Sequence, residues 1–260
     1  MKTSSKDFSY GLLISDIDGT IMDHQEIISP QTKQALNSLT AEGIGVTLAT
    51  GRNYWEARGI VKELNIKLPV ILANGAQIYD FTSEQLLYAD ELDIPVMMNF
   101  LRSLQGEEDT LVRWYDGQQW VSKPLLELLV HEPPQVVQRL MLVRSPDLPS
   151  LVDDDSVPYW IFRDGDYYEF TPKSACKGAG LAKLCSILEI EVEQVVALGN
   201  DPNDCGLLEK AGIGFVVADG NSAVFPYADG IVASMKEHPM IGIAQWMLGN
   251  MPWERIVMLT

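Results

Sequence analysis

LLISDIDGTIMD, residues 12–23, is the stretch of this chain that decides its fold. It overlaps an apolar run, YGLLISDI (10–17), of the kind that forms a strand buried on both faces of a sheet. The stretch places two carboxylates, Asp16 and Asp18, at the end of that strand and follows them with Gly19. Two acidic residues at a strand end are often only a turn or a helix cap. Their meaning therefore depends on what the rest of the chain places beside them.

Strand and helix patterns alternate in both the first and the last third of the chain. Apolar runs that predict buried strands lie at 44–50, 69–74, 195–200, 213–219 and 230–234. Patterns typical of helices lie at 30–42, 52–64, 177–188, 202–212 and 238–248. Such alternation is typical of a parallel sheet with helices on both faces. We therefore predict an α/β fold whose core is a Rossmann-like, doubly wound parallel sheet.

The pattern changes over the middle of the chain. Aromatic residues are dense there, and Asp116-Gly117 and Asp164-Gly165 are turn signals between short strand-like runs. The acidic run Asp153–Asp155 predicts a solvated loop. These features predict an inserted α+β cap domain of a different class. The expected boundaries are 1–82 and 173–260 for a discontinuous core domain and 83–172 for the cap.

The composition limits the classes of protein that fit. The chain has 260 residues and a net charge of −17, which argues against a nucleic acid as partner because phosphates need a basic face. The same charge repels an anionic small molecule, so a local cluster of lysine, arginine or metal must attract it. No apolar run approaches the roughly 18 residues that cross a bilayer, and no secretory signal is recognisable. We therefore expect no membrane partner and a cytoplasmic location.

The cysteines suggest no chemistry of their own. Cys176, Cys185 and Cys205 have neither CxxC nor zinc-site spacing, and we expect reduced thiols in or near the core. The chain also lacks GxSxG and lacks a GxGxxG after a strand. These absences argue against a serine hydrolase and against a dinucleotide-binding fold.

Polar residues follow several of the predicted strands, at the edge where ligands bind in open α/β sheets. They are Asp16 and Asp18 after the first strand, Thr50, Gly51 and Arg52 after the second, Lys177 at a helix start, and Asn200, Asp201, Asn203 and Asp204 after the strand 195–200. Clustered carboxylates need a cation, and hard oxygen ligands suit Mg²⁺. Phosphoryl transfer needs mainly positioning and charge stabilisation, which Thr50, helix N-terminal amides and Lys177 supply.

Each of these groups alone has an ordinary structural explanation, and the prediction rests on their joint occurrence. In the resulting hypothesis, the carboxylate of Asp16 attacks phosphorus and forms an aspartyl phosphate. Asp18 protonates the leaving oxygen and later activates water. The sequence therefore predicts a phosphoryl-transfer site that uses Mg²⁺.

At these positions the chain resembles the haloacid dehalogenase superfamily of Mg²⁺-dependent phosphohydrolases. The four motifs of that superfamily are matched by DIDGT (16–20), TLATGR (47–52), SACKGAG (174–180) and GNDPND (199–204). The insert lies between the second and third motifs, where a type IIB cap sits in such proteins. LANGAQIYD (72–80) and YYEFTPKSACKG (167–178) are similar to Cof-like, sucrose-phosphatase-like and mannosyl-3-phosphoglycerate-phosphatase-like members.

The resemblance implies roles for individual residues. Phosphate binding is implied for Thr50, Gly51, Lys177 and Asn203. Mg²⁺ binding is implied for Asp16, Asp18, Asn200, Asp201 and Asp204. Contacts with substrate are implied for Arg52, Asn74 and Glu169.

The fourth motif departs from the pattern of the superfamily. It usually reads Gly-Asp-x-x-Asn-Asp with a metal ligand at the first Asp, and this chain has Asn200 there. The amide oxygen of Asn200 can still coordinate a metal, but one negative charge is lost. Asp201 is the alternative ligand, with the register shifted by one residue.

We predict a phosphatase that acts on a small phosphorylated metabolite. The favoured substrate class is a sugar phosphate or sugar-acid phosphate. The alternatives are a catalytically weak or silent protein that binds a phosphorylated ligand, which Asn200 favours, a receiver module and a phosphomutase of the same cap type. The specific substrate and the oligomeric state are not legible in the sequence.

The insert holds the residues expected to set specificity. Its aromatic stretches WYDGQQW (114–120) and VPYWIF (157–162) either stack on a sugar ring or form the core of the cap. Its cations either meet an anionic leaving group or are plain surface charges; they are Arg113, Lys123, Arg139, Arg144 and Arg163.

Overall fold

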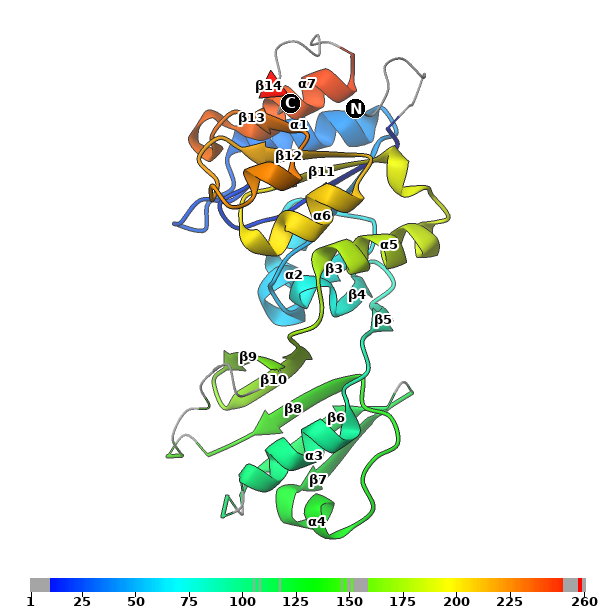
Figure 1. The fold of residues 1–260 in the computed structure, drawn as a ribbon, viewed down its shortest axis with the longest axis vertical. Coiled ribbons are helices and arrows are strands. Elements are labelled where there is room, and N and C mark those ends of the chain that lie inside the picture. The colour runs from blue at the N-terminus through cyan, green and yellow to red at the C-terminus, as the bar shows by residue number, and fades with distance from the viewer. Residues whose placement is uncertain are drawn as a thin grey trace. The chain divides into compact units, whose positions relative to one another are not determined.

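The computed structural model describes residues 10–104, 106–107, 109–116, 118–145, 147–148, 151, 159–249 and 257–258. The chain falls into two compact units: one comprises the chain up to Leu87 and from Cys176 onward, and the other is Tyr88–Ala175 (Figure 1). The predicted bounds of the inserted domain are 83–172. These bounds, and the role of the insert as a cap, stay predictions. Gly117 and the acidic run 153–155 lie outside the described residues.

The central sheet of the first unit has the predicted parallel architecture. Its strands in spatial order are β14 (Val257–Met258), β13 (Gly230–Val232), β12 (Ile213–Val217), β11 (Val195–Gly199), β1 (Leu12–Ser15) and β2 (Gly45–Leu48). Every neighbouring pair is parallel except β13 with β14. The predicted fold class is confirmed, because the chain moves outward from β1 to β2 on one side and through β11, β12 and β13 on the other.

Helices cover both faces of this sheet. They are α1 (Pro30–Ala41), α2 (Tyr54–Glu63), α5 (Lys177–Leu188), α6 (Cys205–Lys210) and α7 (Pro239–Met247). Figure 1 shows α1 and α7 above the strands and α6 below them. Short 3₁₀ turns lie between these elements: η1 (Ala73–Gly75), η2 (Val192–Gln194), η3 (Pro202–Asp204), η4 (Phe225–Tyr227) and η5 (Met235–Glu237).

Local sequence explains where the first two helices begin. The Ser29 side chain accepts a hydrogen bond from the Thr32 amide, and Pro30 occupies the first turn of α1, where its missing N–H costs nothing. Asn53 and Glu56 form a capping box at the start of α2. As a result α2 begins at Tyr54, and Arg52, predicted to be helical, lies in the loop before it.

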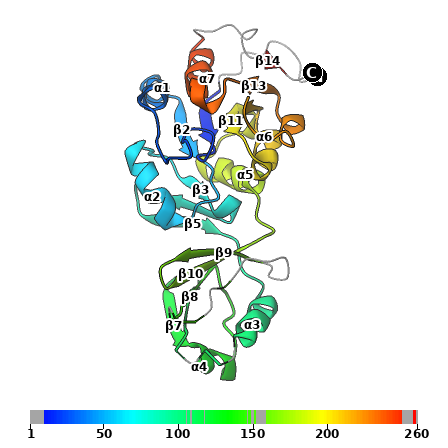
Figure 2. The same cartoon turned by 90° about the vertical axis from the view of Figure 1, so that its left-hand side faces the viewer.

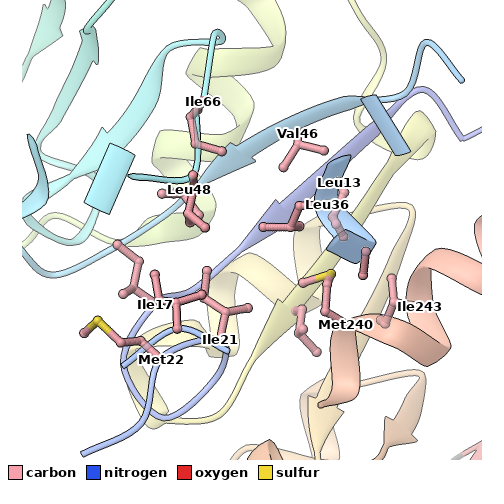
Figure 3. Close-up of a cluster of buried hydrophobic side chains, with 14 of the residues drawn as sticks. Leu13, Ile17, Ile21, Met22, Leu36, Val46, Leu48, Ile66, Met240 and Ile243 are labelled. Atoms are coloured by element: carbon pink, nitrogen blue, oxygen red, sulfur yellow. The ribbon is translucent and has the colours of Figure 1, made fainter. Parts of the chain in front are cut away.

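One hydrophobic core joins the sheet to α1 and α7. Leu13 of β1, Val46 of β2, Leu36 of α1 and Met240 of α7 are each at most 4% exposed. Figure 3 shows these side chains directed toward one another between the elements. Burial of such a side chain is worth about 1.5–3 kcal/mol, so this cluster holds β1 and β2 against α1 and α7.

The third predicted strand does not join the parallel sheet as expected. Strand β3 (Val70–Leu72) belongs to a separate sheet with β4 (Gln77–Asp80) and β5 (Gln85–Ala89), and it pairs antiparallel with β4. A parallel bridge between Ala49 and Ile71, and the hydrogen bond from the Thr50 amide to the Ile71 carbonyl, join β3 to the residues that follow β2. The prediction of a strand within 69–74 is correct. This strand, β3, belongs to a separate sheet because β4 follows after a short turn and pairs with it as a hairpin.

The second unit is an antiparallel sheet with two helices. Its strands in spatial order are β7 (Trp120–Pro124), β6 (Leu111–Tyr115), β8 (Arg139–Val143), β10 (Tyr167–Pro172) and β9 (Tyr159–Asp164). The helices α3 (Ile94–Ser103) and α4 (Leu125–Val130) pack on one face of it. Both predicted hairpins are present, as β6–β7 (Figure 1) and as β9–β10 (Figure 2).

The cysteines differ in environment. Cys185 is buried and Cys205 is half-buried, but Cys176 is exposed, so the prediction of a core position is wrong for Cys176. Cys176 precedes α5, and its Sγ accepts a hydrogen bond from the Ala179 amide as a helix cap.

Within the part of the chain that the structure describes, no helix is both long enough and apolar enough to cross a membrane.

Candidate active site

The site lies where β1 ends between its two neighbours. Ser15 is level with Leu48 of β2 and with Leu198 of β11. The Asp16 amide donates to the Leu198 carbonyl at 2.9 Å, so Asp16 still belongs to the ladder. Because the chain leaves β1 toward β2 on one side and returns to β11 on the other, this is the switch point at which open α/β sheets bind ligands.

The chain turns sharply after Asp16. The Ile17 carbonyl accepts from the amides of Thr20, Ile21 and Met22. Gly19 has a φ of +72°, and a Cβ at this position would lie 2.4 Å from Nδ2 of Asn200. Glycine suits this position because the left-handed backbone conformation is strained for other residues. The turn also lets the hydroxyl of Thr20 donate to Oδ2 of Asp16 at 3.2 Å.

A buried lysine bridges two buried carboxylates. Nζ of Lys177 donates to Oδ1 of Asp16 at 2.6 Å and to Oδ1 of Asp204 at 2.7 Å. Lys177 and Asp204 are 0% exposed and Asp16 is 5% exposed. These three residues, here called the buried triad, come from positions far apart in the chain and meet because α5 and α6 both begin at this edge. A Cβ on Gly178 would lie 2.3 Å from the Gly206 carbonyl oxygen, so the two helices approach backbone to backbone.

The triad has one cation for two carboxylates, and this imbalance affects ionisation. Burial, together with the charge of Asp204, raises the pKa of Asp16 to about 7 against the opposing effect of Lys177. Burial lowers the pKa of Lys177, but the charges of Asp16 and Asp204 outweigh that effect and raise it. The site is therefore short of positive charge, which a bound cation would supply.

Asp204 organises the loop that follows β11. Its Oδ2 accepts from the amides of Asn200 and Asp201 at 2.9 and 3.1 Å. Asp201 is exposed, and its carboxylate caps the short turn η3. Both oxygens of Asp204 thus have protein donors, and its observed contacts are those of a residue that positions Lys177 and the loop. Direct metal binding by Asp201 and Asp204 stays a prediction.

Asn200 supplies the test of whether Mg²⁺ fits this site. Its Oδ1 is buried and has no hydrogen-bond partner among the described residues, while its Nδ2 lies against Gly19. A buried carbonyl oxygen without a donor is costly unless something else satisfies it. Mg²⁺ typically takes one or two carboxylates and completes its shell with water and substrate oxygens. Asp16 and Asn200 fit that requirement, although the described residues contain no group of three or more His, Cys, Asp or Glu placed to hold a metal.

Asp18 forms a bidentate pair with Arg52. Nε and Nη2 of Arg52 donate to the two carboxylate oxygens of Asp18 at 3.0 and 2.8 Å. Nη2 also contacts the Glu26 carboxylate at 3.2 Å. Hydrogen bonds to Asp18 hold the pKa of Arg52 above its ordinary value. Nothing in the sequence singles out Glu26, which reaches this cluster from an exposed turn.

Thr50, Gly51, Asn74 and Asn203 also meet at this edge. Thr50 is fully buried, and its Oγ1 accepts from the Arg52 amide at 3.1 Å. Nδ2 of Asn203 donates to Oδ1 of Asn74 at 2.9 Å, and a Cβ on Gly51 would lie 3.1 Å from the same oxygen. The structure thus brings together the predicted residues that follow β2, β3 and β11.

Glu169 is the one predicted site residue that lies in the second unit. Its Oε1 accepts from Nε and Nη2 of Arg139 at 2.9 and 2.7 Å, and its side chain is buried. Its predicted contact with substrate is not tested by this arrangement.

Comparisons with known proteins find phosphatases among the similar chains. Among curated proteins, the chain is 23% identical over 266 residues to 5-amino-6-(5-phospho-D-ribitylamino)uracil phosphatase YcsE of Bacillus subtilis, covering 95% of this chain and 100% of the relative. It is 27% identical over 222 residues to the phosphoglycolate phosphatase of Methanopyrus kandleri, covering 84% and 88%. Among solved structures, it shares the fold of BT4131, described as a HAD subclass IIB sugar phosphatase, with a TM-score of 0.58, 20% identity and coverage of 92% of this chain and 99% of that one.

The family itself is established by a family model. The model described as haloacid dehalogenase-like hydrolase matches residues 13–140 and 146–247, and so spans both units. It contains Asp16, Thr50 and Lys177 within the matched residues. The chain is an enzyme and belongs to the haloacid dehalogenase-like hydrolases.

Proposed function

We propose that the protein is a Mg²⁺-dependent phosphatase that cleaves a small phosphorylated metabolite through an aspartyl phosphate on Asp16. The observation that carries this proposal is the buried triad at the switch point of the sheet. A turn or a helix cap would leave these carboxylates near solvent. Burying two of them around one lysine is costly and is expected where charge must later be stabilised.

The residues have the chemistry that the reaction needs. Asp16 attacks phosphorus in line with the ester oxygen, and Asp18 gives that oxygen its proton as the phosphorus–oxygen bond breaks. Asp18 then takes a proton from the water that hydrolyses the aspartyl phosphate. Lys177 has three N–H donors and uses two in the triad, which leaves one for a phosphoryl oxygen.

Mg²⁺ would be held by Asp16 and Asn200 and would supply the positive charge that the triad lacks. Oγ1 of Thr50 accepts a hydrogen bond from the Arg52 amide. The hydroxyl hydrogen of Thr50 therefore remains available to donate to a phosphoryl oxygen. Asp18 acts after it leaves Arg52, and Glu26 retains the guanidinium in the meantime.

The relatives support a small phosphorylated substrate. Two curated relatives are named for phosphorylated small molecules of different kinds, and one similar structure is named a sugar phosphatase. On this basis we propose a sugar phosphate or sugar-acid phosphate as the favoured substrate class. A protein that binds a phosphorylated ligand without turnover is the second candidate, and the observation that favours it is Asn200 in place of a charged metal ligand.

Phosphate release separates the two candidates. The purified protein is incubated with p-nitrophenyl phosphate and a panel of phosphorylated sugars and sugar acids, with Mg²⁺ or with a chelator. Mg²⁺-dependent release supports the phosphatase. A folded protein that releases phosphate from none of these compounds contradicts it and supports the binding protein.

Mg²⁺ binding is expected to depend on pH in a defined window. The pKa of Asp16 is raised from an ordinary 3.8 to about 7, so below that pH the folded protein holds a proton that competes with the metal. The metal-free fold gains stability from this proton at low pH and loses it as the pH rises toward 7. The apparent Kd for Mg²⁺ should therefore rise about tenfold for each pH unit below that pKa. Calorimetric titration at several pH values measures it, and a flat profile would contradict the assignment of Asp16 as ligand.

Asn200→Asp is expected to have opposite effects with and without metal. The added carboxylate belongs to the residue whose amide contacts the Asp204 carboxylate, so without Mg²⁺ the melting temperature should fall because two negative charges lie close together. With Mg²⁺ the extra charge should tighten binding and lower the Mg²⁺ concentration that gives half-maximal activity. Melting curves with and without Mg²⁺ measure both effects, and Asn221→Asp is the matched control. Loss of Mg²⁺ binding in Asn200→Asp would count against this residue as a ligand.

A further inference from the structure

The turn at residues 23–27, between β1 and α1, holds a glutamate in a strained backbone conformation. Glu26 has a φ of +60°, which lies in the left-handed region that glycine adopts freely and that other residues adopt at a cost. The Asp23 amide donates to the Ile27 carbonyl across the turn, and Oδ1 of Asp23 accepts from the amides of Gln25 and Ile27. These contacts fix the backbone of Glu26 and the direction in which its side chain leaves the turn. Strain of this kind often accompanies a functional role for the side chain.

Glu26 reaches the proposed acid–base residue through Arg52. Nη2 of Arg52 lies between two carboxylates: it is 2.8 Å from Oδ1 of Asp18 and 3.2 Å from Oε1 of Glu26. Nε of Arg52 donates to the other oxygen of Asp18 at 3.0 Å. All three residues belong to the first unit. We call them the shared-arginine cluster, because one guanidinium serves both carboxylates.

The observed contacts hold Asp18 in a resting position. Two parallel hydrogen bonds from a guanidinium are the arrangement that fixes a carboxylate most firmly. To give a proton to the ester oxygen, Asp18 must turn away from this fork, which would leave the Arg52 guanidinium without its main anionic partner. Glu26 is already within hydrogen-bond distance of Nη2 and can take over the guanidinium as Asp18 leaves.

The strengths of the two contacts make such an exchange possible. Asp18 has two hydrogen bonds to Arg52 and Glu26 has one, so the resting balance favours Asp18. The Asp18 side chain is 54% exposed and the Glu26 side chain is 74% exposed, so water replaces much of what either contact loses. Exposed ion pairs are weak for this reason. Glu26 therefore shifts the balance by a modest factor and does not lock it.

We infer that Glu26 is a positioning residue that draws Arg52 away from Asp18 and so sets how often Asp18 is free to act. This inference rests on the proposed phosphatase function and adds control of its acid–base step by a residue outside the four sequence motifs. Loss of Glu26 should therefore slow substrates whose leaving oxygen needs a proton and spare those whose leaving oxygen does not.

Two aryl esters that differ by one nitro group test the inference. p-Nitrophenolate leaves readily as an anion, whereas phenolate is more basic and gains more from protonation. The ratio of kcat/KM for phenyl phosphate to kcat/KM for p-nitrophenyl phosphate therefore measures the help that Asp18 gives, because changes in phosphate binding affect both esters and cancel. Glu26→Gln should lower this ratio about two- to fivefold, the size expected of an exposed ion pair, and Glu26→Gly should lower it at least as far.

A double-mutant cycle verifies that Glu26 acts through Arg52. Arg52→Met releases Asp18 and should raise the ratio above the wild-type value. In that background Glu26→Gln should have no further effect, because the guanidinium that Glu26 attracts is gone. An equal fall in the ratio with and without Arg52 would overturn the inference.

Glu84→Gly is the matched control for Glu26→Gly. Glu84 is an exposed glutamate with a φ of +56° in the turn between β4 and β5. Both glycine variants should melt at or above the wild-type temperature, because glycine relieves the left-handed strain, but only Glu26→Gly should lower the ratio. A lower melting temperature with an unchanged ratio would give Glu26 a structural role only and would overturn the inference.

The same measurements separate the failure of the inference from the failure of the proposed function. If the wild type hydrolyses both esters and the ratio is unchanged in both Glu26 variants, the inference fails alone. If the wild type releases phosphate from no compound, the proposed function fails and the inference fails with it.

Discussion

Lys177→Met is expected to destabilise the protein by about 3–5 kcal/mol, because removing one partner of a buried ion pair leaves an uncompensated charge. Two carboxylates depend on this ammonium, and Lys177 and Asp204 are fully buried. Methionine fills a similar volume, so the loss reflects charge and not a cavity. Urea unfolding at neutral pH measures the change in free energy. Activity should vanish in the same variant, because the donor to the phosphoryl oxygen is gone.

Two further variants locate the cause of that effect. Lys210→Met removes an exposed lysine from α6 and should change stability by less than about 0.5 kcal/mol. The double variant Lys177→Met with Asp204→Asn removes one of the stranded charges and should recover part of the lost stability. A Lys177→Met protein within about 1 kcal/mol of wild type would show that the triad is not the buried electrostatic unit described here.

Asp16→Asn is expected to lower kcat by about 10⁴-fold or more, since loss of a nucleophile typically has effects of this size. The amide keeps the shape of the side chain but cannot attack phosphorus. Its stability should match or exceed that of wild type without metal, because Lys177 then serves a single carboxylate. Steady-state phosphate release and melting curves together measure the two effects.

Asp23→Asn is the matched control for this substitution. Asp23 lies seven positions along the chain, and its Oδ1 accepts from the amides of Gln25 and Ile27, a role that asparagine can keep. The control should retain nearly full activity. Substantial phosphate release by Asp16→Asn would mean that another group or a water molecule attacks phosphorus.

Much of the fold follows from local signals in the sequence. The Ser29-Pro30 start of α1 and the turn signal at Asp164-Gly165 are short-range patterns, and the structure has the predicted elements there. The meeting of Asp16, Lys177 and Asp204 also follows, although 161 residues separate the first two. Parallel strands place the residues that follow β1 and β11 at one edge of the sheet, and α5 begins at the same edge, so Lys177 meets Asp16 and Asp204 there.

Other features depend on tertiary contacts that no local pattern encodes. The pairing of Arg52 with Asp18 and Glu26 requires the loops after β1 and β2 to approach each other. Free cysteines are usually buried, but Cys176 is exposed because it lies at the start of α5, where its side chain caps the helix. The pairing of Arg139 with Glu169 and of Arg144 with Glu107 likewise depends on how the second unit folds.

The central claim is that Asp16 becomes phosphorylated during turnover, and the most direct measurement is to trap that intermediate. The protein is mixed with its best substrate and Mg²⁺, quenched in acid within one turnover, digested, and analysed by peptide mass spectrometry. The account predicts one phosphoryl group on the peptide that contains Asp16 and none in Asp16→Asn. Phosphate release at the wild-type rate with no phosphorylated peptide at any quench time, or with the group on another residue, would contradict it.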